Sequence, residues 1–270
     1  MLISHRLYSE VKQSLNYGRR EDDWVPNSVQ DQFTVLTYNI RYGRGLDGVQ
    51  DLDRTQEVLR QSQAQLIGLQ EVDNRNQVRS HNIDQSQYLA NSLNMAYHYA
   101  PALNAQAQFG NAILTNFPVL KQESILLPKK GTFEDRSVAI AEVLVGKQPL
   151  TFMVTHLGLT QGERLEHIEL IRNYLSKVAT PVILVGDWNE QPGSPAYNKI
   201  TEVLLDAAAE CDQEQPTFPY LSLYENEATV RIDFIFVSPE IDVIDVEVIQ
   251  NWSSDHLPVR ATLSFKKKGG

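Results

Sequence analysis

Strand-like runs of apolar residues recur along this chain from Phe33 to Phe265, and the helical segments between them do not alternate strictly with the strands. Strict alternation would predict a single doubly wound parallel sheet. The runs at 33–40 and 66–72 are rich in β-branched, aromatic and aliphatic residues, which indicates buried strands. The pattern therefore favours two packed sheets with helices on their outer faces.

The helices are predicted from spacing and from capping residues. The longest is expected from Gly162 to Val178, where apolar residues recur every three or four positions. Three shorter helices are expected: from a cap at Asp53 to about Ser62, over 84–94, and after a cap at Ser194. These helices are too few to cover every strand crossover, which again favours a sandwich of sheets.

Composition and length bound the organisation of the chain. The 270 residues are 42% hydrophobic, and no linker-like segment divides them. We expect one folded domain over residues 32–266, a partly ordered N-terminal extension at 1–31 and a short tail at 267–270.

The cellular setting and the partners are predicted from charge and from cysteine content. The chain has one cysteine, Cys211, and no apolar stretch of the roughly 20 residues that would span a bilayer. We therefore expect a cytoplasmic monomer without a transmembrane segment. The net charge of −10 disfavours a non-specific duplex nuclease, because such proteins bind DNA through a basic face.

Six short segments place a polar side chain at the end of an apolar run. The residues concerned are Asn39, Glu71, His156, Asp187 with Asn189, Asp233, and Asp255 with His256. Polar residues at strand ends that come from across a chain usually belong to one site. Carboxylates, amides and imidazoles without a cysteine suit a hard divalent cation and acid–base chemistry on a phosphate.

Two of these segments carry the strongest chemical signals. Asp233 lies in the apolar run RIDFIFV, where an unpaired carboxylate is costly, so we expect a partner such as His256. Asp187 and Asn189 follow a glycine turn, where a carboxylate can take a proton from water and an amide can hold that water. The alternative for His256 is a structural histidine, and the alternative for Asp187 and Asn189 is an ordinary turn. His156 could belong either to the site or to the core.

The remaining candidates are more evenly balanced on their own. Glu71 lies at the end of a buried strand, where it could bind a hard cation. The alternative is a surface glutamate at the point where the strand ends. Asn39 could equally form a turn. Arg136 could meet a phosphate, although a surface ion pair with Glu134 or Asp135 is the simpler interpretation.

In their order along the chain, the motifs N, QEV, THLG, GDWN, RIDFIF and SDHLPV resemble the endonuclease/exonuclease/phosphatase superfamily of DNase-I-like, metal-dependent phosphohydrolases. The segment GNAILTNFP at 110–118 resembles a structural strand of that family, and the resemblance extends over about residues 33–265. The segments YNIRYGRGLDGVQDLDR and QEVDNRNQVRSHNIDQSQYLA are similar to a bacterial branch of metal-dependent hydrolases. The resemblance implies an α+β fold, a four-layer α/β/β/α sandwich of two mostly antiparallel sheets, with the site where the sheets meet at one edge.

The resemblance also implies a metal and a substrate site. Glu71, helped by Asn39 and Asp255, would hold Mg²⁺ or, alternatively, Mn²⁺. Arg136 and Asn111 would bind the phosphoester substrate.

The resemblance assigns the chemistry to five further residues. Asp187 would activate or orient the attacking water, and Asn189 would position the water and the phosphate. His256, backed by Asp233, would stabilise the phosphorane-like charge or relay a proton. His156 would contact the scissile phosphate, and the reaction would be an in-line attack on the phosphoester.

Arg41 departs from the pattern of abasic-site endonucleases, which have an acid two residues after the motif asparagine. We expect its side chain on the same side as the Asn39 amide, where it would bind a substrate phosphate oxygen. A single tightly held metal is then expected instead of two. The alternative is an ion pair with Asp47 or Asp51.

The expected function is that of a Mg²⁺-dependent phosphoesterase that hydrolyses a phosphodiester or phosphomonoester, on a small or lipid-derived substrate. A nuclease acting on DNA or RNA is the first alternative, which a basic groove of Arg41, Arg44, Arg75, Arg79 and Arg136 would favour. A non-catalytic binding protein on the same fold is the second.

Overall fold

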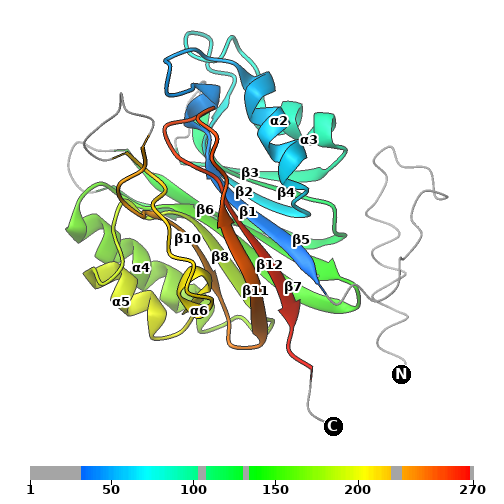
Figure 1. Cartoon of the computed structure of the whole chain (residues 1–270), viewed down its shortest axis with the longest axis vertical. Coiled ribbons are helices and arrows are strands. Elements are labelled where there is room, and N and C mark those ends of the chain that lie inside the picture. Colours follow the sequence, from blue (N-terminus) through cyan, green and yellow to red (C-terminus); the bar gives the residue numbers. More distant parts are fainter. Residues whose placement is uncertain (1–31, 103–107, 130–133, 220–226, 268–270) are drawn as a thin grey trace, which may run out of the picture.

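The computed structural model describes residues 32–102, 108–129, 134–219 and 227–267, and in them two six-stranded sheets pack face to face (Figure 1). The extension expected at 1–31 and most of the tail at 267–270 lie outside the described residues. Within the described part of the chain, every helix is too short or too polar to cross a membrane.

Each sheet is mixed but mostly antiparallel, as expected. The first has the order β11-β12-β1-β2-β4-β3, with β1 (Phe33–Asn39), β2 (Leu66–Asn74), β3 (Ala96–Pro101), β4 (Gln108–Thr115), β11 (Ile241–Val248) and β12 (Val259–Phe265). The second has the order β5-β6-β7-β8-β10-β9, with β5 (Val119–Leu127), β6 (Arg136–Val145), β7 (Gln148–His156), β8 (Val182–Asp187), β9 (Leu205–Asp206) and β10 (Asp233–Val237). Among the described strands, β1 with β2 and β7 with β8 are the parallel pairs.

Helices cover the outer face of each sheet and complete the four layers (Figure 1). The first sheet carries α2 (Leu52–Ser62) and α3 (Gln85–Leu93), and the second carries α4 (Gln161–Leu175) and α5 (Pro195–Thr201). Two short helical turns, η2 (Arg41–Gly43) and α6 (Ala207–Glu210), follow β1 and β9. The α/β/β/α sandwich expected from the sequence is therefore confirmed.

Three apolar clusters hold these layers together. Val35 packs in the central cluster between the sheets, and the next residue, Leu36, packs in the cluster under α2 and α3. Successive side chains of a strand point to opposite faces, and here both faces are covered. This explains why apolar residues of the strand at 33–40 occupy adjacent positions, such as Val35 and Leu36, instead of alternating strictly with polar ones.

Two helix boundaries differ from the sequence prediction. Asp51, not Asp53, caps α2: its carboxylate accepts from the backbone N–H groups of Asp53 and Arg54. The longest helix, α4, starts with a capping box of Thr160 and Glu163 and ends at Leu175. Apolar spacing continues to Val178 because that residue still packs against the same cluster after the helix has ended.

Gly68 lies where the two sheets pack tightly against each other, and it yields a stability prediction. A Cβ on Gly68 would lie 2.5 Å from Val185 Cγ2 and 2.7 Å from Val154 Cγ2. We expect Gly68→Ala to lower the free energy of unfolding by about 1–3 kcal/mol, because overpacking forces core side chains out of their preferred rotamers. Chemical denaturation measures the change.

Gly162→Ala in the first turn of α4 is the matched control, since nothing lies within 4 Å of its added Cβ. We expect this variant to be as stable as the wild type or slightly more stable. Equal losses in the two variants would contradict the packing explanation.

Candidate active site

The residues that the sequence places at strand ends converge at one edge of the sandwich. Asn39 ends β1, and His156 and Asp187 end the parallel strands β7 and β8. Asp233 begins β10, which runs antiparallel to β8, so Asp187 pairs with His156 on one side and Asp233 on the other. Parallel strands end at the same sheet edge and an antiparallel neighbour begins there. The topology thus assembles the cluster from distant parts of the chain.

A β-bulge aims Glu71 toward this cluster. The register of β2 against β4 shifts between Leu69 and Val72, and Glu71 has a φ of 56°. An extra residue in one strand bends it and re-aims a side chain. Glu71 thereby comes within 3.2 Å of the Asn39 side-chain nitrogen.

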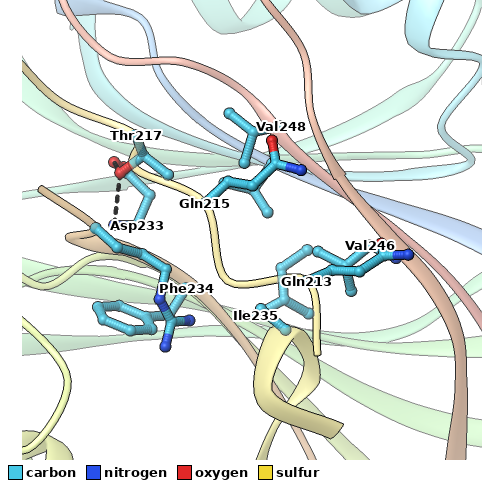
Figure 2. Close-up of a pocket in the computed structure, with 11 residues that line it drawn as sticks. Gln213, Gln215, Thr217, Asp233, Phe234, Ile235, Val246 and Val248 are labelled. Carbon is cyan, nitrogen blue, oxygen red and sulfur yellow. Dashed lines mark hydrogen bonds between the residues drawn. The ribbon is translucent and has the colours of Figure 1, made fainter. Parts of the chain in front are cut away.

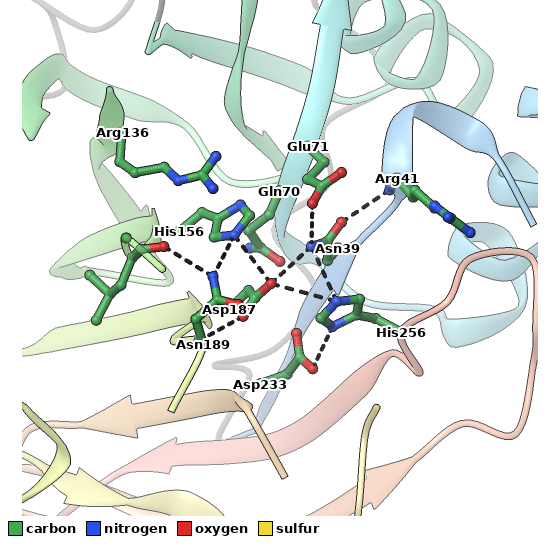
Figure 3. A network of polar contacts seen from close by, with 12 residues as sticks. Asn39, Arg41, Gln70, Glu71, Arg136, His156, Asp187, Asn189, Asp233 and His256 are labelled. Atoms are coloured by element: carbon green, nitrogen blue, oxygen red, sulfur yellow. Dashed lines mark hydrogen bonds and ion pairs between the residues drawn. The ribbon is translucent and has the colours of Figure 1, made fainter. Parts of the chain in front are cut away.

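Asn39 lies at the centre of the cluster and is fully buried (Figure 3). Its Nδ2 donates to Asp187 Oδ2 at 2.9 Å and to Glu71 Oε1 at 3.2 Å, and lies 3.5 Å from His256 Nε2. Its Oδ1 accepts from the backbone N–H of Arg41 at 3.0 Å. The amide nitrogen, not the oxygen, therefore faces the acids. In this arrangement Asn39 organises the carboxylates by hydrogen bonding, and its expected help in holding a metal stays a prediction.

The contact expected between Asp233 and His256 is present. His256 Nδ1 lies 2.9 Å from Asp233 Oδ2, and both residues are buried. His256 Nε2 lies 3.6 Å from Asp187 Oδ2. Thr217 donates to the same oxygen of Asp233 at 2.6 Å. No sequence signal pointed to Thr217, which lies sixteen positions before its partner.

The charges in this cluster shift the pKa values of its members. Burial disfavours the imidazolium of His256, but the carboxylates of Asp233 and Asp187 outweigh it and raise the pKa of His256 to about 10. Burial raises the pKa of Asp187 to about 6, against the opposing charge of His256. At neutral pH the cluster therefore combines an imidazolium with a carboxylate of increased basicity.

His156 and Asn189 lie on the other side of Asp187. His156 Nε2 lies 3.3 Å from Asp187 Oδ2 and 3.0 Å from Asn189 Nδ2. Burial, and then the charges of Arg136 and His256, hold the pKa of His156 well below its usual value, so this imidazole is neutral. Asn189 has a φ of 50°, a conformation that asparagine tolerates, and its backbone N–H donates to Asp187 Oδ1 at 2.9 Å.

Arg41 and Asp255 form an ion pair at the rim of the cluster. Arg41 Nε lies 3.2 Å from Asp255 Oδ2, so both alternatives that name Asp47 or Asp51 are wrong. Those two acids pair with Arg54 instead. The strand ends at Asn39 and Arg41 has a φ of 44°. The side chain therefore turns away from the Asn39 amide, contrary to the expectation for an extended segment (Figure 3).

Arg136 begins β6, and its guanidinium points toward the cluster (Figure 3). Arg136 forms the ion pair with Glu134 that the simpler interpretation predicts, at 3.2 Å. The arginine is buried, however, and does not lie on the surface. Its Nε has no hydrogen-bond partner among the described residues. Asn111 donates to the Ser137 carbonyl at 2.7 Å. A narrow crevice is lined by Ala102, Phe109, Gly110, Asn111, Arg136, Ser137 and His156.

The sequence pattern of the endonuclease/exonuclease/phosphatase family matches residues 36–256. The chain belongs to this family. Family members are hydrolases of the phosphoesterase and nuclease type and generally depend on a divalent metal. No curated protein matches the chain.

Solved structures share the family fold. A family protein from Bacteroides thetaiotaomicron has a TM-score of 0.73 and 21% identity, and the match covers 87% of this chain and 98% of that one. A mannosyl-6-phosphatase from the same organism has a TM-score of 0.72 and 22% identity, covering 86% and 100%. A humanised D. rerio TDP2 has a TM-score of 0.63 and 17% identity, covering 87% and 99%.

Two groups of side chains could receive the divalent metal on which the family generally depends. Asp187, Asp233 and His256 offer ligand atoms within 4.8 Å of one another, but the two carboxylates raise the pKa of His256 to about 10 and so favour an imidazolium, which repels a cation. Burial, and then the charge of Asp255, raise the pKa of Glu71, so a cation beside these two carboxylates would relieve their repulsion. Glu71 with Asp255 therefore fits a hard cation better.

Proposed function

We propose that the chain is a Mg²⁺-dependent phosphoesterase that hydrolyses a small or lipid-derived phosphomonoester or phosphodiester. The observation that carries the proposal is the position of the Asp187 carboxylate, which lies between the side chains of Asn39, His156 and His256. A buried carboxylate beside an amide donor and an imidazolium, with Glu71 on the same amide, suits hydrolysis better than binding alone. This supports an enzyme over the non-catalytic alternative.

Each side chain of the site has its own role in an in-line attack by water. Asp187 accepts the proton of the attacking water, and its pKa of about 6 suits a general base at neutral pH. Asn189 orients that water and the phosphate. His256, charged and held by Asp233, donates from Nε2 to the negative charge that develops on the phosphoryl group. His156 is neutral and donates to a phosphate oxygen.

Glu71 and Asp255 would hold Mg²⁺, with Mn²⁺ as an alternative. When bound, the ion polarises a phosphoryl oxygen and offsets its charge. Arg136 offers its buried, unpaired Nε to the substrate phosphate. Arg41 is available to the substrate only in exchange with Asp255.

Three of the five arginines that would form a basic groove are held by other groups. Arg79 donates twice to the buried Asp73, Arg44 donates to the Gly48 carbonyl, and Arg41 pairs with Asp255. Together with the net charge of −10, this favours a small substrate over nucleic acid. The mannosyl-6-phosphatase among the structural neighbours supports a phosphomonoester within that class.

Activity profiling tests the proposal. We expect the protein to hydrolyse sugar phosphates, p-nitrophenyl phosphate or bis-p-nitrophenyl phosphate with Mg²⁺, and to lose this activity in excess EDTA and regain it with added Mg²⁺. Single-stranded and duplex DNA and RNA are the comparison substrates. Faster cleavage of nucleic acid than of every small phosphoester would establish the nuclease alternative. Undiminished hydrolysis in EDTA would contradict the metal dependence.

Asp233→Asn tests the pairing of Asp233 with His256. We expect the variant to fold and its kcat to fall by about 10- to 100-fold, because an amide cannot stabilise the imidazolium. Steady-state kinetics and thermal unfolding measure both effects. Asp242→Asn on β11, whose side chain is 53% exposed, is the control and should keep wild-type kcat. An unchanged kcat in Asp233→Asn would rule out this role for the pair.

A further inference from the structure

Thr217 joins the two residues of the buried acid–imidazole pair. Its hydroxyl donates to Asp233 Oδ2 at 2.6 Å, the same oxygen that lies 2.9 Å from His256 Nδ1. The hydroxyl oxygen also accepts from the backbone N–H groups of Ile232 and Asp233, at 3.2 and 3.3 Å. Those two bonds leave the hydroxyl proton to the carboxylate, so its direction is determined by the fold.

The segment of Thr217 and Phe218 also holds His256 in place, through the Phe218 ring and through backbone hydrogen bonds. The Phe218 ring lies against the imidazole of His256, with the ring centroids 4.6 Å apart. The Thr217 carbonyl accepts from the backbone N–H of Leu257 at 2.8 Å. The segment is itself tied to Val230, whose carbonyl accepts from the N–H groups of Thr217 and Phe218. Thr217 and Phe218 therefore contact both members of the pair.

The Asp233 carboxylate has one oxygen that the pair does not use. Thr217 and Asp233 line a crevice beside the pair (Figure 2). Asp233 Oδ1 is buried and has no hydrogen-bond partner among the described residues. A carboxylate with an unsatisfied oxygen gains by rotating toward any other donor, such as a water molecule. The Thr217 hydroxyl opposes that rotation.

We propose that Thr217 is a positioning residue: its hydroxyl holds the Asp233 carboxylate in the orientation that fixes the His256 imidazole, while Phe218 restricts the tilt of the ring. This inference rests on the proposed phosphoesterase function. Loss of the hydroxyl leaves Oδ2 with one donor instead of two and frees the carboxylate to turn. His256 then spends less time with Nε2 directed at the phosphoryl group.

Thr217→Val removes the hydroxyl with little change in volume. We expect kcat to fall by about 10- to 100-fold with KM within about threefold of wild type, because the lost orientation acts on the transition state. Thr217→Ser keeps the hydroxyl and should restore most of the rate. A purely structural role would lower stability in both variants without this split between kcat and KM.

Proton NMR of the imidazole Nδ1–H provides a readout that does not need turnover. A proton shared between an imidazole and a carboxylate resonates far downfield, and its signal is assigned to His256 by its loss in His256→Asn. We expect this signal to move upfield or broaden in Thr217→Val and to stay in Thr217→Ser. If Thr217→Val does not fold, Thr217→Ala, which adds no bulk, takes its place.

Thr151→Val is the matched control, since it removes a buried hydroxyl at the opposite end of β7, where Thr151 bonds to Thr180. It should change neither kcat nor the signal. An unchanged signal and an unchanged kcat in Thr217→Val would overturn the positioning role while leaving the phosphoesterase function intact. A wild-type protein that hydrolyses no phosphoester would refute that function, and the NMR comparison would still decide the role of Thr217.

Discussion

Asp187→Asn is expected to lower kcat by about 10²- to 10⁴-fold, the range associated with loss of a general base. The side chain is buried, and its carboxylate is the proposed acceptor of the water proton. An asparagine of the same shape keeps the bond from the Asn189 N–H but cannot accept a proton. Single-turnover and steady-state rates with the best substrate of the panel measure the loss.

The stability of Asp187→Asn should not fall together with its activity. Burial raises the pKa of Asp187, so the folded protein carries the cost of a desolvated carboxylate at neutral pH. Removal of that charge should therefore offset the lost bond from Asn39 Nδ2 and leave the melting temperature near that of the wild type. A variant that is inactive only because it unfolds would contradict the assignment, as would one that keeps the wild-type rate.

Glu71→Ala is expected to abolish detectable activity and to weaken Mg²⁺ binding by at least about tenfold, because the metal loses a carboxylate ligand. Calorimetric titration with Mg²⁺ measures the affinity independently of turnover. The melting temperature in EDTA should stay near that of the wild type, since partial burial and the charge of Asp255 raise the pKa of Glu71 and disfavour its carboxylate without a cation.

Glu57→Ala on the surface of α2 is the control, because Glu57 bonds there to Arg60 and Gln61. It should bind Mg²⁺ and hydrolyse substrate as the wild type does. Full activity of Glu71→Ala in EDTA would end the metal hypothesis. The same titration on the wild type tests the prediction of one metal, and two ions of comparable affinity would refute it.

Local patterns were sufficient for the architecture. Each expected strand and helix was predicted from residues within it: from apolar runs, from helical spacing, or from a helix start such as Ser194 and Pro195. The structure has these elements in two sheets with helices outside. The ordered motifs likewise predicted the family, which the match over residues 36–256 confirms. The contact between Asp233 and His256 was predictable because a buried acid in an apolar strand requires a partner.

The features that only the tertiary structure decided depend on backbone turns and on residues far apart in sequence. The bulge that directs Glu71 toward the site and the turn that brings Arg41 to Asp255 both depend on positive φ angles. A sequence does not indicate a positive φ at a residue other than glycine. Arg136 is buried because its strand begins at the site, and Thr217 bonds to Asp233 although the two lie sixteen positions apart in sequence. Sequence periodicity determined which faces of the chain are buried. Strand pairing and bulges, which no local pattern encodes, determined which polar groups meet there.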